Sequence, residues 1–121
     1  PTGLPVQFES SAVTAVAFGL DGLIYAGTDN GLYVVGADGT YQLELTIADG
    51  LLSNVITDLS IHSNGSVYIA SEGGLNVYDP MTGVVDSIYF GMKLGGRAVY
   101  DLSMTAAGDL WYRTLSGINR L

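Results

Sequence analysis

The chain has 121 residues, enough for one domain, and carries 12 acidic against 4 basic residues, a formal net charge of −8. Hydrophobic residues make up 48% and charged residues 13%, which excludes a disordered chain. The absence of cysteine excludes disulfides and thiolate metal sites, and the negative charge disfavours nucleic acid and anionic membranes as partners. No apolar run reaches the roughly 18 residues of a membrane span, so we expect no membrane insertion.

The sequence repeats itself with a period of 43 residues. Residues 13–35, 56–78 and 99–121 align without a gap. Glycine recurs at two positions of the repeat, an aromatic residue at a third and a hydroxyl at a fourth: Gly22, Gly65 and Gly108; Gly31, Gly74 and Gly117; Tyr25, Tyr68 and Trp111; Thr28, Ser71 and Thr114. Three matching copies predict three structural units of the same kind.

Each repeat divides into short strand-like segments. In the first repeat these are residues 13–18, 23–27, 32–35 and 41–47, with an Asp-Gly pair in each of the two turns. The second repeat copies them with residues 56–61, 67–70, 75–78 and 84–90. No segment has the periodicity of a long helix. Four antiparallel strands in every repeat of about 40–50 residues are typical of a β-propeller blade, and a two-sheet β-sandwich is the alternative all-β fold.

The same residues resemble the two-component regulator propeller repeat. Residues 22–32, GLIYAGTDNGL, fit its pattern G-x-[ILV]-[WY]-[ILA]-[GA]-T-x-x-G-[LI], and residues 49–55, DGLLSNV, are similar to its D-G-L-P-S-N-x-V connection. The resemblance covers nearly the whole chain, with departures at Tyr25 and Tyr68 for Trp, at Arg113 for a small residue, and in residues 91–97. It implies a periplasmic or extracellular sensor region that recognises oligosaccharide-like ligands.

The repeats predict three blades: residues 13–54, residues 56–97, and residues 99–121 completed by a strand at 4–9. Three blades do not close a ring, since propellers typically have about four to eight. We therefore expect a homodimer that forms a six-bladed ring, with residues 4–9 of one copy beside 117–121 of the other. Residues 1–92 hold ten acids and no Lys or Arg, so joining copies end to start brings opposite charges together. The alternative is a piece of a longer propeller.

Seven polar residues are candidates for ligand binding at one end of the blades: Asp58, Asp101, Asp29, Asn30, Glu72, Lys93 and Arg97. The two aspartates of the innermost strands share one repeat position and suit a cation or sugar hydroxyls; the alternative is hydrogen bonding to a neighbouring backbone. We expect the residues of the short loops, Asp29, Asn30 and Glu72, either to contact a ligand or to cap turns. The two basic residues bind an anionic group, or else lie in solvent or at an interface.

Three further residue types have structural interpretations. Arg113 lies within a predicted strand, and we expect it to pair with an acid across a blade junction. We expect Tyr25, Tyr68 and Trp111 to be core aromatics between blades. His62 is the only histidine and lies in the first turn of its repeat, where we expect a structural or solvent-facing role.

The sequence contains no motif for nucleotide, metal or nucleophilic catalysis, so we expect no cofactor and no enzyme activity. The predicted function is a non-catalytic ligand-binding or sensory propeller module, with an oligosaccharide or small molecule as ligand. The alternatives are a lectin-like oligomer with repeated sites and a structural protein–protein interaction module. A propeller lyase or hydrolase is disfavoured by the single histidine. Residues 1–10 lack the basic start and apolar core of a signal peptide.

Overall fold

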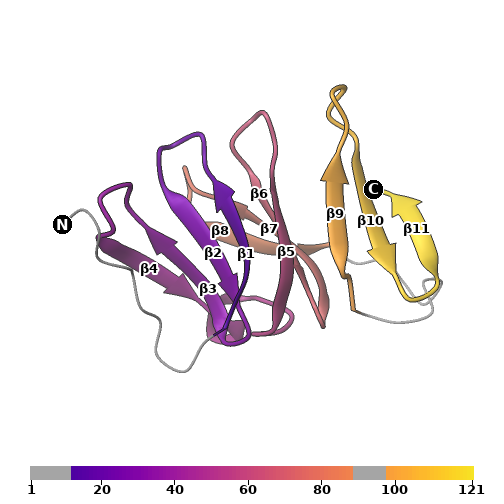
Figure 1. Ribbon diagram of the computed structural model, residues 1–121, viewed down its shortest axis with the longest axis horizontal. Coiled ribbons are helices and arrows are strands. Elements are labelled where there is room, and N and C mark those ends of the chain that lie inside the picture. The colour runs from indigo at the N-terminus through magenta and orange to yellow at the C-terminus, as the bar shows by residue number, and fades with distance from the viewer. Residues whose placement is uncertain (1–11, 89–97) are drawn as a thin grey trace.

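The computed structural model describes residues 12–88 and 98–121, which form three antiparallel sheets. The first sheet contains strands β1 (Val13–Phe18), β2 (Ile24–Thr28), β3 (Gly31–Val35) and β4 (Tyr41–Leu45), and the second contains β5 (Ile56–Ile61), β6 (Val67–Ser71), β7 (Gly74–Asp79) and β8 (Val84–Ile88). The third contains β9 (Asp101–Met104), β10 (Leu110–Thr114) and β11 (Gly117–Arg120). Neighbouring strands in the chain are neighbours in each sheet, and the sheets stand side by side along the molecule (Figure 1).

The two repeated glycine positions have the backbone conformation that hairpin turns require. Gly22, Gly65 and Gly108 have φ of 83°, 94° and 92°, in the left-handed region that side chains with a Cβ rarely adopt. Their turns join the first and second strands of each sheet, so the first hairpin of every repeat turns in the same way.

One predicted strand ends earlier than expected. Residues 41–47 were expected to be extended, but β4 stops at Leu45 and a 3₁₀ helix, η1 (Ile47–Asp49), follows. Thr46 caps this helix: its Oγ1 accepts a hydrogen bond from the Ala48 N–H (3.2 Å), and Asp49 Oδ2 accepts one from the Thr46 N–H (2.9 Å). The capping box ends the strand, although Ile47 continues its apolar alternation.

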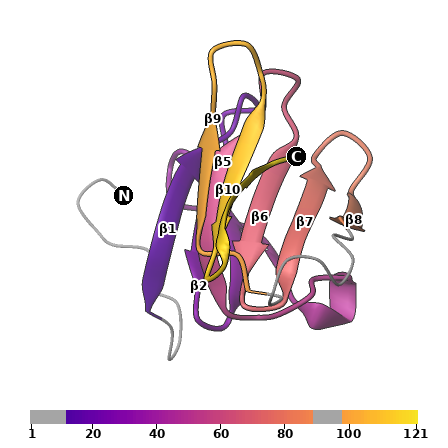
Figure 2. The same ribbon diagram turned by 90° about the vertical axis from the view of Figure 1, so that its right-hand side faces the viewer.

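The hydrophobic core lies between the sheets. A first cluster fills the junction of the β1–β4 and β5–β8 sheets, and its fully buried members are Tyr25, Leu32, Val34, Ile56, Val67 and Ile69. A second cluster fills the next junction with Ala70, Leu75, Val99, Leu110 and Tyr112. Viewed from the β9–β11 side, the sheets lie one behind another (Figure 2). A sheet with a neighbour on each side therefore buries side chains on both of its faces, as stacked propeller blades do.

The two junctions repeat the same contacts. Thr14 Oγ1 donates a hydrogen bond to the Ile56 carbonyl (2.7 Å), and Thr57 Oγ1 donates one to the Val99 carbonyl. Each hydroxyl belongs to the innermost strand of one blade, and each carbonyl lies where the next blade begins. Positions 43 residues apart therefore have the same structural role. The predicted strand at residues 4–9, which was to complete the third blade, lies outside the described residues.

Candidate functional site

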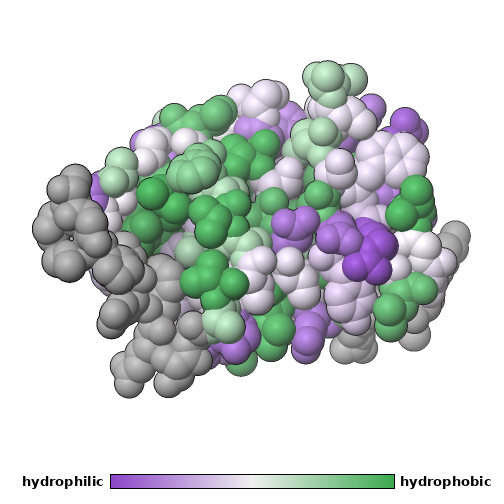
Figure 3. Space-filling model, in the orientation of Figure 1, coloured by the Kyte–Doolittle hydropathy of each residue, from purple (hydrophilic) through white to green (hydrophobic). Residues whose placement is uncertain are grey.

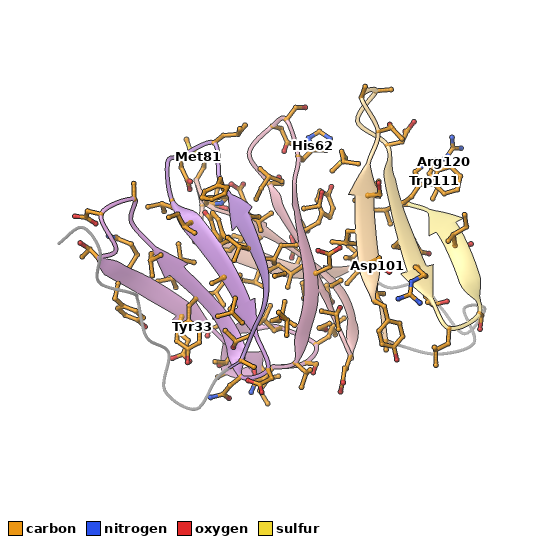
Figure 4. The ribbon with its side chains drawn as sticks, viewed as in Figure 1. Tyr33, His62, Met81, Asp101, Trp111 and Arg120 are labelled. Carbon is orange, nitrogen blue, oxygen red and sulfur yellow. The ribbon has the colours of Figure 1, made fainter. Side chains whose placement is uncertain are left out.

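One end of the blades carries the connections singled out from the sequence. The short loops at residues 28–31, 71–74 and 114–117 and the longer connection at residues 46–55 all lie at the lower end in Figure 1. We call this the loop end. The opposite end, the turn end, carries the first hairpin turns, and the labelled His62 lies there (Figure 4).

A buried hydroxyl holds each short loop of the loop end in shape. Thr28 Oγ1 donates to the Gly31 carbonyl (2.7 Å) and accepts a hydrogen bond from the Asn30 N–H (2.9 Å). Ser71 Oγ accepts one from the Gly73 N–H (3.2 Å), and Thr114 Oγ1 accepts one from the Ser116 N–H (3.1 Å). The recurring hydroxyl therefore fixes the loop backbone, a role that its recurrence alone did not reveal.

The three loop residues proposed for ligand binding divide into two kinds. Asp29 is tied to the start of β1, because its Oδ1 accepts a hydrogen bond from the Ala12 N–H (3.0 Å). Asn30 and Glu72 are exposed, and neither side chain has a hydrogen-bond partner within residues 12–88 and 98–121. These two polar side chains remain available for an external group at the loop end of adjacent blades.

Asp58 joins two blades. Its Oδ1 accepts a hydrogen bond from the Leu59 N–H (2.8 Å), and its Oδ2 accepts one from the Leu102 N–H of the third blade (2.7 Å). The carboxylate thereby satisfies a backbone donor on the inner strand of the next sheet. The equivalent residue of the third blade, Asp101, is exposed and has a different partner.

Arg113 pairs with an acid inside its own blade, so the expected pairing across a junction is wrong. Its Nε donates to Asp101 Oδ2 (2.5 Å), and its guanidinium carbon lies 5.3 Å from the ring centre of Tyr100. The register of β9 and β10 places Arg113 directly opposite Asp101, and opposite charges in that relation attract. The periodicity predicted the strands but not this register.

Lys93 and Arg97 lie outside the described residues. Within the described ranges, no three His, Cys, Asp or Glu side chains gather closely enough to hold a metal ion. In the same part of the chain, no helix is long and apolar enough to cross a membrane.

The aromatic position of the repeat is buried in the first blade and open in the last. Tyr25 is fully buried, its ring centre is 6.3 Å from that of Tyr78, and its hydroxyl donates to Asp21 Oδ2 (2.8 Å). Trp111 is 39% exposed, so its expected place between blades is wrong for a single copy of the described chain. Beside it lies a hollow of about 290 Å³ lined by Asp101, Arg113 and Ile118, which the sequence analysis did not predict.

Tyrosine burial gives an expected pH dependence. Burial, followed by the hydrogen bond to Asp21, raises the pKa of Tyr25 above its usual value near 10, and burial also raises that of Tyr78. Because these pKa values are raised in the folded state, the contribution of the two protonated tyrosines to the free energy of unfolding is complete below about pH 10. It is lost as the pH rises further. Unfolding measured by denaturant from pH 8 to about 11 should therefore show declining stability, and Tyr25→Phe should flatten the decline. The exposed control Tyr41→Phe should leave the decline unchanged. Equal slopes of stability against pH for the unchanged chain and both variants would contradict this prediction.

Comparison with known proteins identifies solved structures with a similar fold. No family model matches the sequence, and no curated relative matches it. The extracellular domain of the hybrid two-component system protein BT4673 of B. thetaiotaomicron has a TM-score of 0.79 at 20% identity, over 90% of this chain and 16% of that one. The corresponding domain of BT3049 from the same organism gives 0.78 at 21% identity, over 89% and 15%.

A third solved structure is an enzyme. Virginiamycin B lyase of Staphylococcus aureus has a TM-score of 0.68 at 16% identity, over 97% of this chain and 43% of the lyase. The chain thus spans about a sixth of the two sensor domains and less than half of the lyase. At these identities the likenesses establish the fold: the sheets are β-propeller blades, as in the extracellular domains of two-component system proteins, and the two-sheet sandwich is excluded.

Proposed function

We propose that the chain is a non-catalytic, ligand-binding part of a sensory propeller that works in the periplasm or outside the cell and meets its ligand at the loop end. The observation that carries this proposal is the pair of exposed polar side chains, Asn30 and Glu72, on loops of adjacent blades. The loops beneath them are held by the buried hydroxyls of Thr28 and Ser71. A fixed loop backbone leaves only the side chains to be ordered on binding.

The chemistry of these side chains favours a neutral ligand rich in hydroxyl groups, such as an oligosaccharide. A carboxylate accepts hydrogen bonds from hydroxyls, and an amide both donates and accepts. A net charge of −8 disfavours anionic ligands. The solved extracellular domains of two-component system proteins with this fold support a sensory role.

The position of the histidine supports a role without catalysis. In the lyase with this fold, a variant in which one histidine is replaced by alanine is described as catalytically inactive. In this chain the only histidine, His62, lies in a turn at the turn end, where its Nδ1 accepts a hydrogen bond from the Asn64 N–H (3.0 Å). The loops between β2 and β3 and between β6 and β7, which hold the proposed ligand residues, lie at the other end of the blades (Figure 1).

A glycan array followed by titration of any oligosaccharide that binds tests this function. Glu72→Ala and Asn30→Ala should each weaken binding about tenfold, the effect of losing one hydrogen bond to a ligand of this kind, without changing the melting temperature. Asp109→Ala, which removes an exposed carboxylate near the turn end of the third blade, is the matched control and should bind as the unchanged chain does. Binding that is indifferent to Glu72 and Asn30, or the absence of any glycan ligand, would contradict the proposal.

A further inference from the structure

Two sheet faces at the ends of the blade row have no neighbour among the described residues. The first, which we call the opening face, is the side of the β1–β4 sheet turned away from the second blade, and it carries Val16, Phe18, Ile24 and Tyr41. The second, the closing face, is the outer side of the β9–β11 sheet, and it carries Asp101, Ser103, Trp111, Arg113, Ile118 and Arg120. Hydrophobic atoms gather over the β1–β4 side of the molecule (Figure 3), and Trp111 and Arg120 lie together beyond β10 (Figure 4).

The repeat shows what each of these faces does elsewhere in the chain. Trp111 and Ile118 of the closing face occupy the repeat positions of Tyr25 and Leu32, which the second blade covers completely. Tyr25 and Leu32 are both 0% exposed, whereas Trp111 is 39% and Ile118 68% exposed. The closing face is therefore the same surface that, in the first blade, receives a neighbouring blade.

The residues of the opening face also have buried equivalents, in the second blade. Val16 occupies the repeat position of Leu59, which packs into the first junction at 8% exposure, but Val16 itself is 55% exposed. Phe18 corresponds to Ile61, which packs against the same cluster, and is 72% exposed. The opening face is thus the surface that a blade presents to the blade before it.

We propose that a second copy of this chain covers both faces, with the opening face of each copy docked on the closing face of the other. Two such junctions, related by a two-fold axis, close a ring of six blades, within the range of about four to eight that propellers adopt. Charge favours the pairing: the closing face carries Arg120 beside the mutually paired Arg113 and Asp101, and the opening face carries Glu44, which lies opposite Tyr33 on the side away from the second blade. This inference does not depend on the proposed ligand.

The junction between the second and third blades also predicts a particular hydrogen bond across the junction between two copies. Asp58 Oδ2 accepts a hydrogen bond from the Leu102 N–H of the following blade (2.7 Å). Shifted by one repeat, the same relation joins Asp101 of one copy to the Val16 N–H of the other. In such a dimer, the first blade of the other copy fills the hollow beside Asp101 and Trp111, which is then not a ligand pocket.

Arg113 makes the closing junction differ from the inner ones at one point. Its repeat position holds Gly27 in the first blade and Ala70 in the second, where Ile56 and Val99 pack closely. In the third blade the guanidinium reaches across to Asp101 of the neighbouring strand β9 and to Tyr100. Removal of this long side chain in Arg113→Ala is therefore expected to leave the dimer intact, whereas it would weaken a ligand bound in the hollow.

The solution mass of the whole chain and of two exposed-site variants tests the proposal. The unchanged chain should have twice its 12.7 kDa mass by sedimentation equilibrium. Phe18→Asp and Ile118→Asp place a charge in the interface, so each should raise the dissociation constant more than about a hundredfold. Both side chains are exposed in one copy, so each variant should keep its fold. Met81→Asp and Leu115→Asp change even more exposed apolar residues outside the two faces and should remain dimeric.

A mixture of the two variants distinguishes the proposed pairing from other dimers. Phe18→Asp keeps an intact closing face and Ile118→Asp an intact opening face, so the mixture should form one sound junction and associate more tightly than either variant alone. If the unchanged chain has the mass of one copy up to its solubility limit, the proposal is wrong. It is equally wrong if Phe18→Asp still dimerises through the closing face alone, or if the mixture shows no recovery.

Discussion

Replacement of Asn76 by alanine is expected to lower the free energy of unfolding by about 2–4 kcal/mol. Asn76 is fully buried, and its side-chain amide nitrogen donates to the carbonyls of Gly50 and Asp86, both at 3.1 Å. Its Oδ1 accepts a hydrogen bond from the Leu52 N–H (2.9 Å). The variant removes these three hydrogen bonds at the place where the connection from the first blade meets the second.

Denaturant unfolding followed by circular dichroism measures this cost. The matched control is Asn64→Ala, in an exposed turn, where the lost bond from the Ser66 N–H leaves a group that water can satisfy. The control should cost about 0.5–1 kcal/mol. A loss at Asn76 no larger than that of the control would show that the side chain does not anchor the connection.

Replacement of Gly27 by alanine is the second large effect, at about 1–3 kcal/mol of destabilisation. A Cβ at this position would lie 2.5 Å from Ile56 Cγ2, so the blades would have to move apart at their first junction. Ile56→Ala removes the Cγ2 that the new Cβ would meet. Gly27→Ala combined with Ile56→Ala should therefore recover at least about 1 kcal/mol relative to the sum of the single changes.

A double-mutant cycle on the free energies of unfolding measures the recovery. Ile56→Ala alone should cost about 2–5 kcal/mol. The control cycle combines Gly27→Ala with Ile61→Ala, at the other end of β5, and should be additive because the two sites share no contact. Additivity in the first cycle as well would mean that Ile56 does not limit the size of the side chain at position 27.

The repeat made most of the blade structure predictable from the sequence. The glycines that recur at three equivalent positions adopt a left-handed φ, and strands β1 and β5 have the predicted bounds. The end of β4 was not predictable from alternation, because a capping box at Thr46 and Asp49 competed with the apolar pattern and ended the strand. Local hydrogen bonding there outweighs the apolar periodicity.

The contacts of the candidate sites were harder to predict than the blades. The partner of Arg113 depends on the register of β9 and β10, which no spacing in the sequence specified. Asn76 was missed because the first repeat holds Tyr33 at its position, and the asparagine shared with Asn119 of the third repeat was not recognised as a signal. Asp58 and Asp101 were recognised as equivalent, yet only the three-dimensional arrangement shows that one has a neighbouring blade and the other does not.

A crystal structure of the whole chain measures most directly whether equivalent positions have equivalent roles at every junction. We expect two copies around a two-fold axis, with a carboxylate oxygen of Asp101 at about 2.7–3.2 Å from the Val16 nitrogen of the other copy, as in the bond from Leu102 to Asp58. Trp111 and Phe18 would then be buried at the junction. A lattice in which Trp111, Ile118 and Phe18 all face solvent would contradict the account.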